Sequence, residues 1–189
     1  MSEFDDVLRL IAEADLPPDV DWPPAGATAA DLSRLRENLG FDLPEVLTSW
    51  LSVCNGSFAG PGGLFGANLT GRRNFLDISS YIEDRPSWRD RRWIPVAGDG
   101  CGDYYILDAS RSHHPGDAIF FVDQSDYETL AYAIASDLPT FLRQYLLEAQ
   151  DQDPELDPTP RWPFDQATTL AVDPGLAELR TQRLLPWNS

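Results

Sequence analysis

The sequence predicts a domain in which helices surround a β-sheet with a hairpin at its centre. The hairpin prediction rests on residues 93–108, W-I-P-V-A-G-D-G-C-G-D-Y-Y-I-L-D. Two short runs rich in β-branched and aromatic residues flank a turn, as in paired strands. The turn carries Gly98, Gly100 and Gly102, and glycine supplies the positive φ angles that tight connections need. Helical patterns precede and follow this segment, so we expect it to lie in the middle of the fold.

Helices are expected before the hairpin. Apolar residues recur with helical spacing over residues 3–15, 28–40, 43–54 and 74–84. Thr28 is expected to cap the second of these helices, in a capping box with Asp31. A glycine-rich stretch, residues 56–66, could hold a phosphate on its backbone N–H groups, but no Lys-Ser/Thr pair follows it. We therefore expect a surface loop there.

The elements after the hairpin are a strand, an ambiguous segment and a helix. Ala118–Val122 is expected to be the strand, whereas residues 128–135 fit a strand or a helix equally. Ser136 or Asp137 then begins an amphipathic helix that runs to about residue 150.

The resulting organisation is one domain with an extension. Residues 1–150 form the domain, with 1–24 as an N-terminal helix and linker and 28–149 as the core. Residues 151–189 contain six prolines, yet they are too apolar for a freely solvated tail. We expect them to pack on the domain, with a short helix after Asp173. A contact exchanged with a second chain is the alternative.

Charge is the strongest compositional signal. Thirty-one acids and fourteen bases give a net charge of −17, and every base is arginine. Such a surface repels phosphates, so we expect neither nucleic-acid nor anionic-membrane binding. Thirteen acids and two arginines lie between residues 93 and 160, so the excess is concentrated in the second half. Solubility explains this charge most simply, and a basic partner is the alternative.

Localisation and redox state are further expectations. No apolar run reaches the length of a membrane span, and the segment M-S-E-F-D-D does not resemble a secretory signal. We therefore expect a cytoplasmic protein. Its two cysteines, Cys54 and Cys101, are expected to be reduced and buried.

Catalytic motifs are weak. Adjacent His113 and His114 are expected to be exposed turn residues, because no third ligand accompanies them. Asp99, Asp103 and Asp108 could together bind a divalent cation, but carboxylates in glycine-rich turns are commonly turn formers. We expect no metal and no cofactor. The arginines around Trp88, between residues 85 and 92, are expected to pair locally with acids.

Three segments in order resemble the SUKH superfamily, the Smi/Knr family. They are L-P-E-V-L-T-S-W-L-S-V-C-N-G (43–56), the hairpin at 93–108, and I-A-S-D-L-P-T-F-L-R-Q-Y-L (134–146). The resemblance spans about residues 28–149; Val46-Leu47 replace the aromatic usual after the first L-P. It implies an α+β fold, a mostly antiparallel sheet packed against several helices. It also implies an interaction module and not an enzyme. Bacterial members often neutralise co-encoded toxins, many of them nucleases, and fungal members regulate cell-wall synthesis.

Charge and resemblance together predict a binding function. The leading hypothesis is an immunity protein, monomeric or weakly dimeric, that binds a basic nuclease-like toxin through acidic turns. The residues expected to contact the partner are Asp99, Asp103, Asp123, Asp126 and Glu128. Gly98, Gly100 and Gly102 are expected to shape the turn. A regulatory scaffold with a non-toxin partner is the second hypothesis. A metal-dependent hydrolase, which would need a cation at Asp99 and Asp103, is the third.

Overall fold

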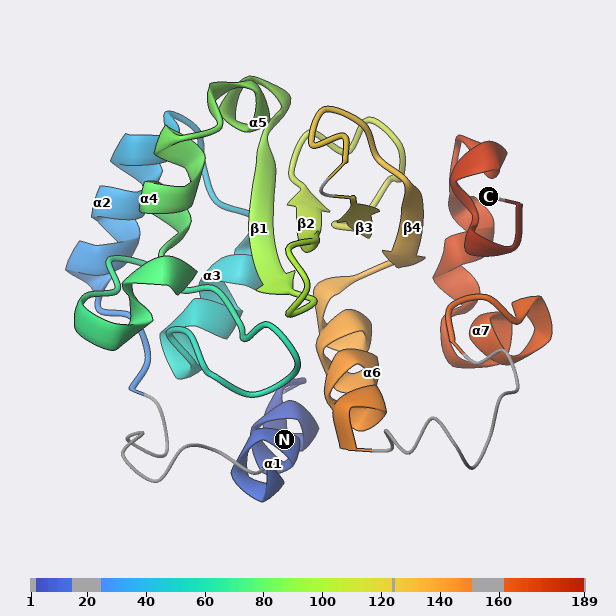
Figure 1. Ribbon diagram of the computed structural model, residues 1–189, viewed down its shortest axis with the longest axis horizontal. Coiled ribbons are helices and arrows are strands. Elements are labelled where there is room, and N and C mark those ends of the chain that lie inside the picture. Colours follow the sequence, from blue (N-terminus) through green and yellow to red (C-terminus); the bar gives the residue numbers. More distant parts are fainter. Residues whose placement is uncertain (1–2, 15–24, 124, 151–161, 189) are drawn as a thin grey trace.

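A central antiparallel sheet packed against helices forms the fold (Figure 1). A computed structural model describes residues 3–14, 25–123, 125–150 and 162–188. The expected linker at residues 15–24 and the first part of the extension, 151–161, lie outside these residues. The expectation of an α+β fold with a mostly antiparallel sheet is confirmed. No helix of the described residues combines the length and the apolar character needed to cross a bilayer.

The sheet has strand order β1-β2-β3-β4, and each pair of neighbours is antiparallel. The strands are β1 Trp93–Gly98, β2 Tyr104–Asp108, β3 Ile119–Val122 and β4 Tyr132–Ala135. The central hairpin is therefore β1 and β2. The ambiguous segment at 128–135 ends in a strand because Phe121 and Tyr132 pair across β3 and β4.

Helices precede and follow the four strands along the chain. The α-helices are α1 Asp5–Glu13, α2 Ala29–Leu39, α3 Glu45–Val53, α4 Ile78–Glu83, α5 Pro86–Arg91, α6 Leu138–Gln150 and α7 Gln166–Val172. Shorter 3-10 helices are η1 Gly71–Leu76, η2 Pro174–Glu178, η3 Gln182–Leu184 and η4 Pro186–Asn188. The capping box of α2 forms as expected, since Thr28 and Asp31 each accept the other's backbone N–H.

Two differences from the expected helices lie between α3 and β1. The helix expected over 74–84 is divided at Asp77, whose buried carboxylate accepts the backbone N–H groups of Leu69 and Ser80. This carboxylate ends η1 and begins α4. The arginine-rich segment that follows forms α5, which the sequence did not predict. Pro86 begins it and Arg92, with φ 58°, ends it in the left-handed region.

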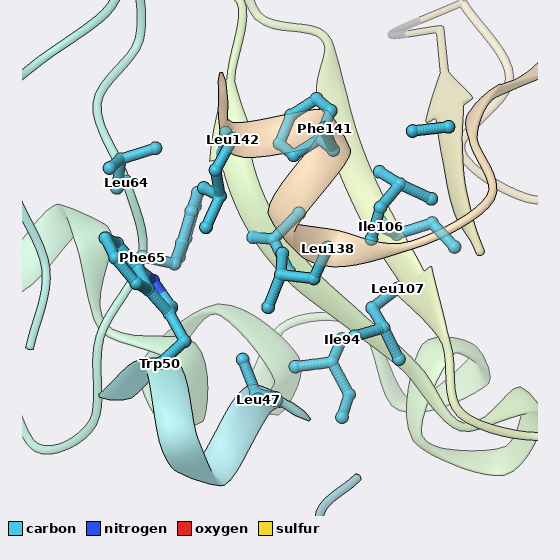
Figure 2. Packing of buried hydrophobic residues seen from close by; sticks show 14 of the residues in the cluster. Leu47, Trp50, Leu64, Phe65, Ile94, Ile106, Leu107, Leu138, Phe141 and Leu142 are labelled. Carbon is cyan, nitrogen blue, oxygen red and sulfur yellow. The ribbon is translucent and has the colours of Figure 1, made fainter. Parts of the chain in front are cut away.

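The main core lies between one face of the sheet and helices α3 and α6. Ile94 and Leu107 are register partners, so their side chains leave the same face. Figure 2 shows them directed toward Leu47 of α3 and Leu138 of α6. All four are buried. Helix α1 packs against α6, and the ring of Phe4, the N-cap residue of α1, lies 5.2 Å from that of Trp50 in α3.

Residues 162–188 pack beside β4, at one edge of the sheet (Figure 1). The buried carboxylate of Asp173 accepts the backbone N–H of Ser136 at 2.6 Å and its hydroxyl at 2.5 Å. The backbone N–H of Arg180 donates to the carbonyl of His113 at 2.8 Å. The helix that follows Asp173 is the 3-10 helix η2. Both contacts lie near the Ala135 end of β4, because the connection that carries His113 leads into Ile119, which pairs with Ala135.

The expectation that both histidines are exposed is wrong, because the C-terminal segment covers His114. His114 is 5% exposed. Its Nε2 lies 3.0 Å from the carbonyl oxygen of Gly175, and Gly116 N–H donates to its Nδ1. His113 is half-buried, with Nδ1 3.1 Å from Asp108. The two cysteines are free, but only Cys54 is buried, and Cys101 is exposed in the hairpin turn.

Replacing Asp173 with alanine should loosen this segment. Asp173→Ala removes the acceptor of two buried Ser136 donors, so we expect a loss of about 1–3 kcal/mol in the free energy of unfolding. Urea denaturation measures it. Glu178→Ala, an exposed acid on η2, is the matched control and should change stability by less than about 0.5 kcal/mol. Equal stability of the two variants would contradict the anchoring role of Asp173.

Candidate functional site

Strand pairing brings acidic residues together at one end of the sheet. Tyr104 pairs with Gly98 of β1 and with Val122 of β3, which aligns three strand ends in one row. The residues one step beyond this row are all acidic: Asp99, Asp103 and Asp123. Neighbouring strands lie about 4.8 Å apart, so these backbones are within roughly 10 Å of each other. The register thus gathers three of the predicted site residues.

Helix α6 adds a fourth carboxylate that the sequence analysis missed. The pKa of Tyr132 is raised to about 12, mainly by burial and also by nearby negative charges. These charges come from Asp103, Glu148, Asp99 and Asp123. We call these four residues the acidic end. Glu148 lies one helical turn after Tyr145, which is buried and faces the sheet. This spacing puts the two residues on the same side of α6 and could have identified Glu148 from the sequence.

The hairpin turn is held in one conformation by Asp99. Its Oδ1 accepts three backbone N–H groups, from Cys101 at 2.8 Å, Gly102 at 3.0 Å and Asp103 at 2.8 Å. Gly100 and Gly102 have positive φ angles of 86° and 110°. The carboxylate of Asp99 therefore shapes the turn as well as contributing charge.

Gly98 and Gly100 have a second role, which is to let another loop approach. A Cβ on Gly62 would lie 2.4 Å from the carbonyl carbon of Gly98 and 2.6 Å from the nitrogen of Gly100. The glycine-rich loop thus packs backbone to backbone against the hairpin turn. Most of its residues are buried, so the expectation of a surface loop is wrong. Gly98 itself lies in β1 and has no positive φ.

The hydroxyl of Tyr145 joins these two loops to α6. It donates to the carbonyl of Gly98 at 2.7 Å and accepts the backbone N–H of Gly62 at 3.1 Å. Burial raises the pKa of Tyr145, since the phenolate would lose its hydration. The neutral hydroxyl therefore serves as both donor and acceptor.

The two remaining predicted residues lie on the β3–β4 turn. Asp126 accepts the backbone N–H of Glu128 at 3.0 Å and the hydroxyl of Thr129. The Thr129 hydrogen bond is the main cause that lowers the pKa of Asp126. Glu128 forms an ion pair with Arg91 at 3.0 Å and accepts the hydroxyl of Ser87. Arg91 compensates the charge of Glu128, so the expected local pairing with an acid forms at Arg91, whereas Arg85 packs on the ring of Tyr81.

Asp108 does not join the other aspartates. It closes the far end of β2 and is 1% exposed. Its carboxylate accepts the hydroxyls of Ser110 and Ser112 and lies beside His113. Burial raises its pKa, but these hydrogen bonds outweigh that effect and lower it. A cation site shared with Asp99 and Asp103 is therefore contradicted. Within the described ranges, no three His, Cys, Asp or Glu side chains are grouped to hold a metal ion.

The chain belongs to the SMI1 / KNR4 family (SUKH-1). The model of this family matches residues 26–144, which is more than half of the chain. The match covers α2 to β4, the hairpin turn and the first half of α6. It leaves out α1 and the C-terminal segment. A comparison with curated proteins found no match. The resemblance noted from three sequence segments is thus confirmed.

Removing the Tyr145 hydroxyl should destabilise the site. Tyr145→Phe leaves the Gly98 carbonyl and the Gly62 N–H without this partner, so we expect a loss of about 1–3 kcal/mol in the free energy of unfolding. Tyr132→Phe is the control, because its hydroxyl forms no hydrogen bond with the residues that the structure describes, and it should cost less than about 0.5 kcal/mol. Thermal or urea unfolding measures both. The role assigned to Tyr145 fails if the variants are equally stable.

Proposed function

We propose that this chain is a non-catalytic binding protein of the immunity type. It binds and neutralises a basic, nuclease-like toxin through the acidic end of its sheet, in the cytoplasm, as a monomer or weak dimer and without a cofactor. The observation that carries the proposal is the strand register, which brings Asp99, Asp103 and Asp123 to one end of the sheet, where they and Glu148 raise the pKa of Tyr132. Membership of the family, whose resemblance implies an interaction module, supports the proposal, and the net charge of −17 supports a partner of positive charge.

Charge complementarity favours a nuclease among basic partners. An enzyme that holds phosphates needs a positively charged cleft, and an acidic surface is attracted to that cleft. Opposite fields raise the association rate by about 10- to 1,000-fold at low ionic strength. An immunity protein must bind before its toxin reaches nucleic acid, so a fast association rate has a direct use.

Preorganisation supports the same proposal. The turn that carries Asp99 and Asp103 is fixed by three hydrogen bonds to one carboxylate and by the packing of Gly62. A surface that is already ordered loses little conformational entropy when a partner binds.

The placement of the histidines supports a non-catalytic role. The sequence contains two, and both follow β2 at the end of the sheet opposite the acidic end. His113 lies beside Asp108, and His114 is covered by the C-terminal segment. The acidic end therefore has no histidine to act as a general base.

A pull-down from lysate of the source organism, at low and then high salt, tests this function. Mass spectrometry identifies the eluted proteins, and each purified candidate is then assayed for nuclease activity with and without this chain. We expect a basic nuclease that high salt releases and that one equivalent of the chain inhibits. Recovery of only neutral proteins without toxic activity would overturn the immunity proposal and favour the regulatory scaffold.

Charge neutralisation at the acidic end should slow association with that partner. The double variant Asp123→Asn and Glu148→Gln keeps side-chain shape and removes two charges. We expect the association rate at low salt to fall about tenfold and the difference to shrink at high salt. Stopped-flow fluorescence measures the rate.

The matched control for this experiment is Glu37→Gln with Glu83→Gln. Both residues are exposed, on α2 and α4, which lie on the other side of β1 from β4 (Figure 1). This control removes the same net charge from a different surface. If it slows association as much as the acidic-end variant, the acidic end is not the contact surface.

A further inference from the structure

A line of aromatic rings crosses the sheet next to the acidic end. Tyr105 of β2 pairs with Phe121 of β3, which pairs with Tyr132 of β4, so these rings share one face. Their ring centroids are 5.5 Å and 5.0 Å apart. Phe164, from the C-terminal segment, continues the line at 5.3 Å from Tyr132. We call these four residues the aromatic ladder.

The outer part of the ladder is open to solvent. Phe164 is 48% exposed, and Tyr132 is half-buried. Exposed aromatic rings cost hydration free energy, and they recur where proteins bind partners. Asp103 and Asp123 lie two residues from Tyr105 and Phe121 on the same strand face, and all four carboxylates of the acidic end are near enough to Tyr132 to raise its pKa. An apolar partner would have to remove water from these charges without replacing it, which is unfavourable. A cation with a flat apolar surface fits both the rings and the charges.

The opposite face of the sheet shows this chemistry within the chain itself. The guanidinium carbon of Arg85 lies 3.8 Å from the ring centroid of Tyr81 and 5.0 Å from that of Tyr127. No carboxylate of the described residues lies within ion-pair distance of Arg85, so aromatic rings are its main neighbours. By contrast, none of the arginines in the described part of the chain lies over a ring of the ladder.

We propose that the aromatic ladder receives an arginine side chain of the basic partner. The guanidinium stacks on the exposed ring of Phe164, next to Tyr132, and its N–H groups donate to carboxylates of the acidic end. Arginine fits better than lysine, because its planar group stacks on rings and offers several N–H donors at fixed angles. This inference rests on the proposed function, in that it takes the partner to be basic, and it names the side chain that the partner inserts.

Two synthetic peptides test the preference for arginine. Both have the same length and charge, with either arginines or lysines spaced in a Gly-Ser background, and each carries a fluorophore for anisotropy. We expect the chain to bind the arginine peptide about three- to tenfold more tightly than the lysine peptide. Equal affinity for the two peptides would overturn the proposal.

Two variants test whether the aromatic ladder causes the preference for the arginine peptide. Phe164→Ala should bring the affinity ratio of the two peptides close to one, while the lysine peptide keeps its salt-dependent binding. Phe75→Ala removes an aromatic side chain that is 61% exposed on η1, away from the ladder, and should leave the ratio unchanged. A ratio that survives Phe164→Ala overturns the assignment to the ladder, and so does a loss of the ratio in Phe75→Ala.

The outcomes separate this inference from the function on which it rests. If both peptides bind equally, and a basic nuclease is still inhibited, the acidic end binds by charge and the ladder has no special role. If neither peptide binds, the ladder proposal is overturned, and the nuclease inhibition assay decides independently whether the chain neutralises a basic toxin.

Discussion

The structure depends on a close contact between two backbones, which the hydroxyl of Tyr145 holds together. Residue 62 can only be glycine there, because any Cβ would meet the backbone of the hairpin at 2.4 Å. At this contact the backbone N–H of Gly62 and the carbonyl of Gly98 both face the hydroxyl of Tyr145 in α6. A buried polar group without a partner costs about 1–3 kcal/mol, so this arrangement fixes three segments at once. The position of the hairpin turn, and of its aspartates, follows from it.

That constraint explains how like charges are kept close together. Carboxylates on neighbouring strand ends repel each other, and the repulsion favours conformations in which the turn opens. The chain opposes this with hydrogen bonds from its own backbone, three of them to Asp99, and with the ion pair between Glu128 and Arg91. Repulsion that remains in the free protein is relieved when a cation binds. A surface of this kind therefore destabilises the unbound protein slightly, and the proposed basic partner would relieve that repulsion on binding.

The sequence analysis predicted the structural features that depend on residues close together along the chain. It missed the features that depend on contacts between residues far apart along the chain. The hairpin, the capping box at Thr28 and the acidic turns are local patterns, and pairing of adjacent strands then places Asp99, Asp103 and Asp123 in a row. Glu148 was missed because the rotation of α6 relative to the sheet is set by packing. The burial of the glycine-rich loop and of His114 was missed for a related reason. Both are covered by segments far away in sequence, and no local pattern reports such coverage.

The C-terminal segment shows how a family domain acquires a particular surface. β4 is the last strand of the sheet, and an uncovered edge strand offers free N–H and carbonyl groups to other chains. Residues 162–188 pack beside this edge, anchored by the buried carboxylate of Asp173. The same segment places Phe164 against Tyr132, although residues 145–188 lie outside the family match. The part of the chain within the family match thus supplies most of the carboxylates, and a segment outside the match supplies the exposed ring beside them. Charge alone attracts many basic proteins, whereas a ring at a fixed place favours those that can present a planar cation to it.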